Sequence, residues 1–240
     1  MKKRIWELDA LRGVCMIIIM LFHLWYDLVY LFGVAELNTP FALRLYRLIN
    51  DFGGTPFLLL SGVCITIGSH CIKRGLQVIG GGMIISAITA GMYLFNFADK
   101  SIIIYFGVLH CIGVCMLLWP LFRKLPVPVL FVLGAVIIVV GLWLRKGVYV
   151  EFPWLIPLGL PTRSFASSDY FPLLPNLGYF LVGAAIGRTC YREKTSLLPR
   201  VNGDHILIRP FCFIGRNSLI FYLLHQPVLA GAVSLWLMFQ

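Results

Sequence analysis

Charged residues are scarce in this chain. Asp, Glu, Lys and Arg make up 12% of its 240 residues, whereas soluble domains contain roughly 25%. Hydrophobic residues account for 60%, and the mean hydropathy is +0.89. The polar stretches are too short for an added soluble domain, so we expect residues 1–240 to form a single unit. This composition excludes a water-soluble globular protein and predicts an all-α, polytopic membrane helix bundle.

The chain also lacks a small-residue cleavage site after its basic start, MKKR, so we expect the first apolar segment to be retained as a helix. A hydrocarbon core of about 30 Å needs ~20 helical residues. Measured against this length, the apolar segments predict seven spans, near residues 10–33, 55–71, 77–96, 102–121, 126–144, 174–190 and 212–238. Twelve Lys and Arg residues then lie on the N-terminal side of the membrane and six on the other side. This asymmetry predicts a cytoplasmic N-terminus and a C-terminus outside.

Signals for nucleic acid, metal or nucleotide phosphate binding are missing. The net charge of +10 comes from basic residues scattered in short loops, a pattern typical of membrane topology, so no nucleic acid is expected. Cys111 and Cys115 are four residues apart, but without further ligands to complete a site no metal is expected. The GGG at 80–82 lacks the Lys and the strand context of a phosphate loop, which favours close helix packing.

Two predicted outer segments are long. Residues 34–54 include FALRLYRLINDF, whose periodicity indicates a helix along the surface. Residues 145–173 are rich in Pro and aromatic residues, which predicts an ordered lid or re-entrant loop. An outward-facing acceptor site could be built from this loop.

Ionisable residues inside the first apolar segment are the main candidates for function. RIWELDALRGVCMIIIMLFHLWYDLVYLFG contains Arg12, His23 and Asp27, and each such group costs about 3 kcal/mol within a membrane. At ~100° per residue, the step from Arg12 to His23 leaves a rotation of about 20°, and the step to Asp27 adds about 40°. The three side chains therefore share one stripe, with Arg12 near the inner surface and His23 about halfway across.

This stripe has two interpretations. Asp27 could hold the tautomer of His23 so that the imidazole acts as a general base, while Arg12 holds phosphates. Alternatively, Arg12 extends to the inner surface or pairs with Asp9, and His23 and Asp27 form a polar network that locks helix packing. An intramembrane His and Asp on one face favour the functional interpretation.

Further histidines occur in later segments. His225 shares a face with Ser218 and Tyr222 in the last predicted span, and Arg216 falls on the opposite side unless Pro227 changes the helix. A hydrogen bond between helices is the alternative role for His225. His110 lies between Gly107 and Gly113, which indicates a packing hydrogen bond.

RIWELDALRGVCMIIIMLFHLWYDL resembles the opening signature of bacterial relatives of the heparan-alpha-glucosaminide N-acetyltransferase catalytic-domain family. DFGGTPFLLLSGVCI, SSDYFPLLPNLGYFLVGAAIG and IGRNSLIFYLLHQPVL resemble later parts of that family, so the likeness covers nearly the whole chain. The Arg-x10-His spacing and YLLHQP are also similar to the wider superfamily of membrane acyltransferases.

The resemblance implies an enzyme of the bacterial cytoplasmic membrane that moves an acetyl group from cytoplasmic acetyl-coenzyme A to a sugar-containing acceptor outside. Arg12 and His23 match the essential pair, with His23 as general base or transient acyl carrier. The other matched positions imply donor binding by Arg12, Arg216, Asn217 and His225, and acceptor binding by Asp51 and Asp169. Membrane lipids are further expected partners, and the oligomeric state, including a homo-oligomer, is left open.

The chain departs from the lysosomal members of this family. They have Asn at the position of His23 and a candidate catalytic His in the first lumenal loop, whereas residues 34–54 here contain no His. The glucosaminide specificity of those members is therefore not carried over.

The alternative function is a proton-coupled transporter that uses His23, Asp27 and His225 as relay sites. The absence of an inverted repeat in the sequence weakens this alternative. A non-catalytic membrane scaffold is a third, weaker possibility.

Overall fold

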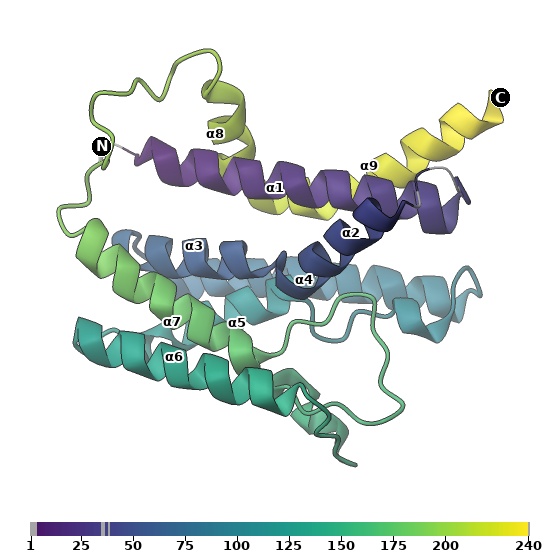
Figure 1. Ribbon diagram of the computed structural model, residues 1–240, viewed down its shortest axis with the longest axis horizontal. Coiled ribbons are helices and arrows are strands. Elements are labelled where there is room, and N and C mark those ends of the chain that lie inside the picture. Colours follow the sequence, from purple (N-terminus) through teal and green to yellow (C-terminus); the bar gives the residue numbers. More distant parts are fainter. Residues whose placement is uncertain (1–3, 35–36, 38, 240) are drawn as a thin grey trace. The chain divides into compact units, whose positions relative to one another are not determined.

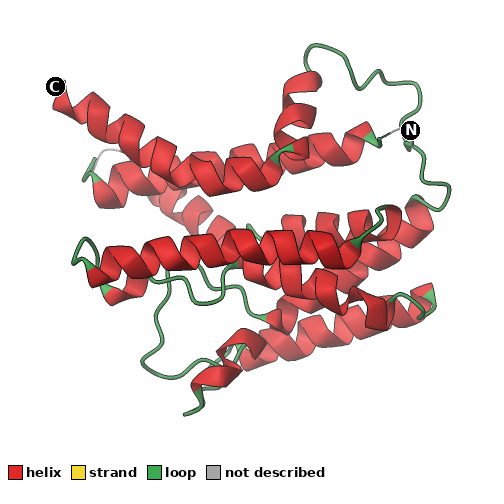
Figure 2. Ribbon diagram, turned by 180° about the vertical axis from the view of Figure 1, so that it is seen from behind, coloured by secondary structure: helices red, strands yellow, loops and turns green. Residues whose placement is uncertain are grey.

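The computed structural model describes residues 4–34, 37 and 39–239, without the side chains of Leu31, Asn50, Asp51, Phe52 and Leu237. The described residues are helical and contain no strand apart from one isolated bridge between Phe106 and Tyr170 (Figures 1 and 2). The α-helices are α1 (Trp6–Tyr26), α2 (Pro40–Phe52), α3 (Thr55–Ile67), α4 (Cys71–Leu94), α5 (Val108–Phe122), α6 (Val127–Leu144), α7 (Leu173–Cys190), α8 (Arg209–Arg216) and α9 (Ser218–Met238). Short segments of other types are the π-helical η1 (Asp27–Leu31) and the 3-10 helices η3 (Lys100–Ile102) and η4 (Pro153–Leu158).

Four helical segments are long and apolar enough to cross a membrane: Trp6–Tyr30, Cys71–Leu94, Val127–Leu144 and Ser218–Trp236. Two further apolar helices, Thr55–Ile67 and Val108–Phe122, are shorter than a bilayer core requires when they run straight across it. The structure therefore fits the expected helical membrane bundle. The count of seven spans and the orientation of the termini stay predictions.

The chain divides into two compact units, Met1–Phe57 with Thr195–Gln240, and Leu58–Lys194. The expectation of a single domain over 1–240 stays a prediction.

In the first unit, α1 packs against α8 and α9 (Figure 1). Glycines allow α1 and α8 to meet closely: a side chain at Gly13 would collide with the carbonyl of Phe211, and one at Gly215 would collide with the carbonyl of Asp9. Glu7 is buried and accepts hydrogen bonds from the hydroxyl of Ser196 (2.8 Å) and the backbone N–H of Leu197 (2.7 Å). These contacts fix the loop before α8 against the start of α1.

The predicted last span, 212–238, is wrong in its extent because the structure breaks it into α8 and α9 at Asn217. Asn217 has a non-helical backbone (φ −108°, ψ 21°), and its side-chain amide donates to the carbonyl of Phe213 at 2.9 Å. A short polar side chain that bonds its own backbone competes with helix continuation. The break lets α8 and α9 pack on α1 separately.

In the second unit, α7 is the central helix, with Phe180, Leu181 and Ala184 fully buried. It packs against α6, where Gly178 and Gly134 meet, and close to α3, where a side chain at Gly62 would collide with the carbonyl of Phe180. Small residues that let helix backbones approach are typical of membrane helix packing.

The glycines at 80–82 follow the predicted packing role in part. A side chain at Gly82 would collide with the ring of His110, whereas Gly80 has open space beside it. The ring of His110 accepts from the N–H of Gly107 at 3.3 Å and lies 3.5 Å from the hydroxyl of Ser86. His110 thus caps the start of α5 and links α5 to α4. This agrees with the packing hydrogen bond that the glycines beside His110 predict.

The loop at 145–172 is ordered, as its composition predicts. The hydroxyl of Tyr170 donates to the carbonyl of Ile156 at 2.6 Å, and the N–H of Phe171 donates to the carbonyl of Phe106 at 3.0 Å. Burial raises the pKa of Tyr170 to about 12. These bonds tie the loop to η4 and to the segment before α5.

Candidate functional site

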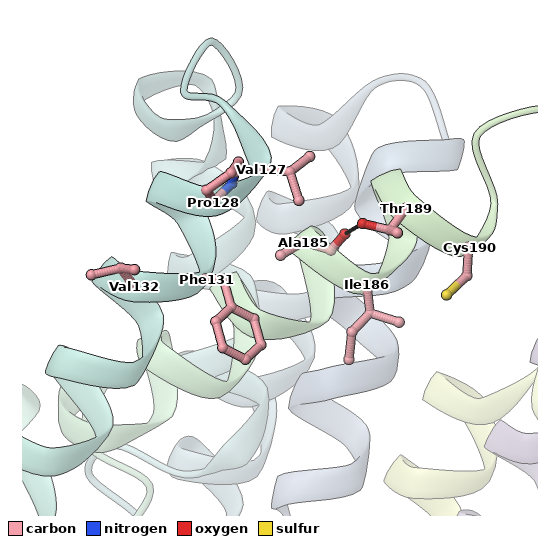
Figure 3. A pocket seen from close by; sticks show the side chains of 8 residues that line it. All are labelled: Val127, Pro128, Phe131, Val132, Ala185, Ile186, Thr189 and Cys190. Atoms are coloured by element: carbon pink, nitrogen blue, oxygen red, sulfur yellow. Dashed lines mark hydrogen bonds between the residues drawn. The ribbon is translucent and has the colours of Figure 1, made fainter.

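An apolar hollow between α6 and α7 is not a candidate for chemistry. Its volume is about 430 Å³, and Figure 3 shows Phe131 and Val132 of α6 facing it together with Ala185 and Ile186 of α7. The hydroxyl of Thr189 at its edge already donates to the carbonyl of Ala185 at 2.9 Å. No acid, base or carboxylate is among the described residues that line the hollow, whereas α1 and α9 carry such groups.

Two histidines meet where α1 crosses α9. Nδ1 of His23 lies 3.1 Å from Nε2 of His225, and the ring centroids are 4.9 Å apart. The carbonyl of Ile19 lies 3.1 Å from the same Nδ1 of His23, and the carbonyl of Tyr222 lies 2.7 Å from Nδ1 of His225. Each ring is therefore held by its own helix as well as by the other ring.

These contacts fix where the hydrogens lie. A carbonyl oxygen only accepts, so Nδ1 of His225 donates to Tyr222 and the Nε2 of a neutral His225 is an acceptor. Nδ1 of His23 then donates, shared between the carbonyl of Ile19 and Nε2 of His225. Nε2 of His23 is left with its lone pair, and no hydrogen bond to it is present within the described part of the chain. A neutral imidazole with a free lone pair has the form needed for a general base or a nucleophile.

The sequence predicts a hydrogen bond between Asp27 and His23, but the structure gives Asp27 a different partner. Both of its oxygens accept from Nε2 of Gln226, at 2.9 and 3.0 Å, and the residue is 2% exposed. Spacing of four residues places His23 and Asp27 on the same side of α1, but α9 offers each of them a nearer partner. Asp27 therefore reaches the histidine pair indirectly, by holding the residue next to His225.

The helix changes type at this point. The N–H of Phe32 bonds the carbonyl of Asp27 at 2.9 Å, five residues back, and η1 runs from Asp27 to Leu31. Segments of π-helix inside α-helices are frequent at functional sites.

A basic cluster lies nearer the N-terminus of α1, around the carboxylate of Asp9. Arg216 Nε is 3.1 Å from Asp9 Oδ2, Arg12 Nη1 is 3.8 Å from Oδ1, and Arg4 Nη1 is 4.0 Å from Oδ2. Three guanidinium groups face one carboxylate, an excess of two positive charges. The sequence predicts that Arg216 lies on the opposite side from His225 if both residues belong to one helix. The helix breaks at Asn217, so Arg216 belongs to α8 and reaches Asp9.

The remaining predicted residues lie elsewhere. The amide of Asn217 is directed back to α8, with no contact to Arg12 or His225 among the described bonds. Oδ2 of Asp169 accepts from the N–H of Val108 at 3.2 Å and so holds the 145–172 loop at the start of α5. The side chain of Asp51 falls outside the described residues.

Sequence reasoning missed Gln226, and it gave Asp9 only as an alternative partner of Arg12. Asp9 precedes Arg12 by three residues, a spacing that signals their contact. Gln226 had no such signal, because its role depends on α9 packing against α1. The Oε1 atom of Gln226 is buried without a hydrogen bond within the part of the chain described.

The chain is similar to a known protein family over most of its length. The family model, described as heparan-alpha-glucosaminide N-acetyltransferase, catalytic, matches residues 4–227. No curated protein and no solved structure matches the chain. The matched range includes both the arginine cluster and the histidine pair.

Proposed function

Since this chain belongs to the heparan-alpha-glucosaminide N-acetyltransferase catalytic family, we propose that it transfers an acetyl group from cytoplasmic acetyl-coenzyme A to a sugar-containing acceptor outside. The family and the apolar helices together indicate a membrane acetyltransferase. The observation that carries the proposal is the free Nε2 lone pair of His23, held in place by His225. The multi-pass arrangement in a bacterial cytoplasmic membrane is part of the same proposal.

The arginine cluster supports a donor site at the inner end of α1. Guanidinium groups form strong, charge-assisted hydrogen bonds with phosphates, and Arg4, Arg12 and Arg216 outnumber the carboxylate that they share. Arg12 and His23 are eleven residues apart on one continuous helix, which is roughly 16 Å along its axis. The pantetheine arm has about thirteen bonds from phosphorus to sulfur, equivalent to ~15 Å of extended chain. Phosphates held at the arginines would therefore place the thioester beside His23.

The chemistry follows from the tautomer of His23. Nε2 accepts the proton of an acceptor hydroxyl or amine while that oxygen or nitrogen attacks the thioester carbonyl. The new C–O or C–N bond forms, the C–S bond breaks, and the leaving thiolate takes the proton from the imidazolium. In the alternative route the same lone pair attacks the thioester carbonyl first, so that the N–C bond forms and the C–S bond breaks with release of the thiolate. The acceptor oxygen or nitrogen then attacks the acetyl-imidazolium, the N–C bond breaks to restore the neutral imidazole, and the acceptor proton passes to the thiolate. His225 stabilises the imidazolium in either route by accepting the Nδ1 hydrogen.

A direct test uses the whole chain in detergent with acetyl-coenzyme A. We expect a thermal shift on binding of acetyl-coenzyme A and slow release of free thiol by hydrolysis of the thioester. Absence of both binding and hydrolysis would overturn the acetyltransferase proposal. The transporter alternative has no support from the family match and would require proton-dependent flux into liposomes without any thioester.

The pairing of the histidines leads to a prediction for His225. His225→Ala removes the acceptor for the Nδ1 hydrogen of His23, and we expect kcat to fall by about 10- to 100-fold, since hydrogen bonds to charged groups contribute roughly 1.5–3 kcal/mol. His225→Gln supplies an amide oxygen as a replacement acceptor and should recover part of the loss. Steady-state kinetics, with the Tm of each variant, distinguish this role from a packing role. Equal rates for the two variants would contradict it.

The arginine cluster leads to a prediction of its own. Arg216→Gln should raise the KM for acetyl-coenzyme A by about 10-fold with little change in kcat, because a charge-assisted contact to phosphate is lost. The effect should shrink as salt is added, since screening weakens exposed charge pairs. Arg200→Gln, in the exposed loop before α8, is the matched control and should leave the KM unchanged. Equal KM values for the two variants would show that Arg216 does not bind the donor.

A further inference from the structure

A cluster of aromatic rings joins α1 and η1 to α2, close to His23. Its centre is Tyr46 of α2, whose ring stacks on Phe22 at 5.3 Å and on Tyr26 at 6.0 Å. Trp25 and Tyr30 also lie within 6.0 Å of the Tyr46 ring. The indole N–H of Trp25 donates to the carbonyl of Leu37 at 3.1 Å, which holds Leu37 beside the cluster.

The cluster has an accessible side that carries hydroxyl groups. Tyr26 and Tyr30 are 40% and 50% exposed, and their ring centroids are 5.0 Å apart. The rings of Tyr26 and Tyr30 each lie 6.0 Å from that of Tyr46, so the three phenols lie near one another. Burial, followed by these two phenols, raises the pKa of Tyr46. No hydrogen bond between these phenols is present among the described residues. Their hydroxyls are therefore available to an external partner.

The aromatic cluster lies next to His23, the proposed base. Tyr26 and Tyr30 follow His23 by three and seven residues, so they lie roughly one and two turns further along α1 and η1. Their rings face Tyr46 of α2, whereas His23 faces α9. The Phe22 ring contacts both the His23 ring, at 5.4 Å, and the Tyr46 ring. The arginine cluster lies on the other side of His23 along the helix. A molecule on the tyrosines would thus approach His23 from the end opposite to the donor.

We propose that Tyr26, Tyr30 and Tyr46 form the acceptor subsite and bind the face of a pyranose ring. This inference rests on the proposed acetyl transfer, whose acceptor is a sugar-containing molecule. The face of an aromatic ring carries negative charge, which attracts the polarised C–H groups on the flat side of a sugar, and the phenols can bond its hydroxyls. An amino sugar would gain further attraction between its ammonium group and the rings. An acetyl-accepting hydroxyl or amine on such a sugar would lie toward Nε2 of His23.

Tyr and Trp also gather at membrane interfaces without binding any ligand. Tyr and Trp residues that only mark the membrane interface would have no preference for a pyranose over an open-chain polyol. The pyranose subsite requires that preference, because an open-chain polyol has the same hydroxyls but no flat C–H face.

The test measures binding of methyl β-D-glucopyranoside, methyl β-D-glucosaminide and sorbitol to the whole chain in detergent, without a donor, by saturation-transfer NMR. We expect at least one glycoside to bind and sorbitol to bind at least 10-fold more weakly. Tyr30→Leu should weaken glycoside binding by about 10-fold, whereas Phe41→Leu, at an exposed aromatic of α2 outside the cluster, should not change it. Leu keeps the site apolar, so loss of binding would report the lost ring.

Failure of this inference is distinguishable from failure of the proposed function. If acetyl-coenzyme A is bound and hydrolysed but neither glycoside binds, or if sorbitol binds equally well, the tyrosine subsite is wrong while the donor site stands. If Tyr30→Leu binds the glycosides as the unchanged chain does, the subsite is wrong as well. Glycoside binding without any action on acetyl-coenzyme A would contradict the acetyltransferase proposal and leave a sugar site at the tyrosines.

Discussion

His23→Ala is expected to lower acetyl transfer and thioester hydrolysis by about 10²- to 10⁴-fold, the usual contribution of a general base. The substitution removes the only group in the histidine pair whose lone pair is free of protein hydrogen bonds among the described residues. Binding of acetyl-coenzyme A should persist, because the arginine cluster lies roughly 16 Å away along α1. Thiol release from acetyl-coenzyme A and a thermal shift with the same ligand measure the two effects separately.

His205→Ala is the matched control for this prediction. His205 lies in the exposed loop before α8, and its ring accepts only from the nearby N–H of Leu207 among the bonds described. Its loss should leave the transfer rate and donor binding unchanged. A His23→Ala protein that is folded, binds the donor and retains more than a tenth of the rate would show that another group is the base.

Gly215→Ala is expected to have the largest effect on stability among single-methyl changes in the first unit. The added Cβ would collide with the carbonyl of Asp9 and lie 2.9 Å from the backbone nitrogen of Gly13, so α8 must move away from α1. Neither obstacle is a flexible side chain. Overpacking of this kind costs about 2–3 kcal/mol, which for a chain of this size lowers the Tm by roughly 5–10 °C. Thermal unfolding in detergent measures the change.

Gly231→Ala provides the control, because no atom lies within 4 Å of a Cβ at that glycine of α9. Its Tm should stay the same or rise slightly, since Ala favours helix more than Gly. Gly215→Ala should in addition weaken binding of acetyl-coenzyme A, because Arg216 follows directly and would lose its alignment with Asp9. An unchanged Tm for Gly215→Ala would mean that α8 does not pack against α1 at this glycine.

The sequence predicts local features of the site well. The apolar run from Val14 to Phe22 makes the segment around it a helix, and helical spacing alone places His23 and Asp27 on one side of it. The glycines beside His110 predict close packing, and Gly82 does lie against that ring. Asp9 is within reach of Arg12 by its spacing. Most of these inferences depend on residues only a few positions apart.

Partners distant in the sequence could not be predicted in the same way. The contact between His23 and His225 spans some two hundred residues, and nothing in either segment fixes the rotation of α9 against α1. Asp27 therefore has Gln226 as its partner where spacing indicated His23. The aromatic cluster could not be predicted either, because its central ring comes from α2 and the packing of α2 against α1 is not evident from the sequence.

The amino-acid sequence by itself determined that this protein is an apolar helical chain, because composition and periodicity act along each helix separately. Its likeness to an acetyltransferase family also lies in the sequence, in motifs such as that around Arg12 and His23. Only the tertiary structure decided which side chains meet. Helix breaks such as Asn217 and close crossings such as Gly13 with Phe211 set how α8 and α9 lie on α1. Those crossings select the hydrogen-bond partners of each imidazole, and through them the nitrogen that is free to react.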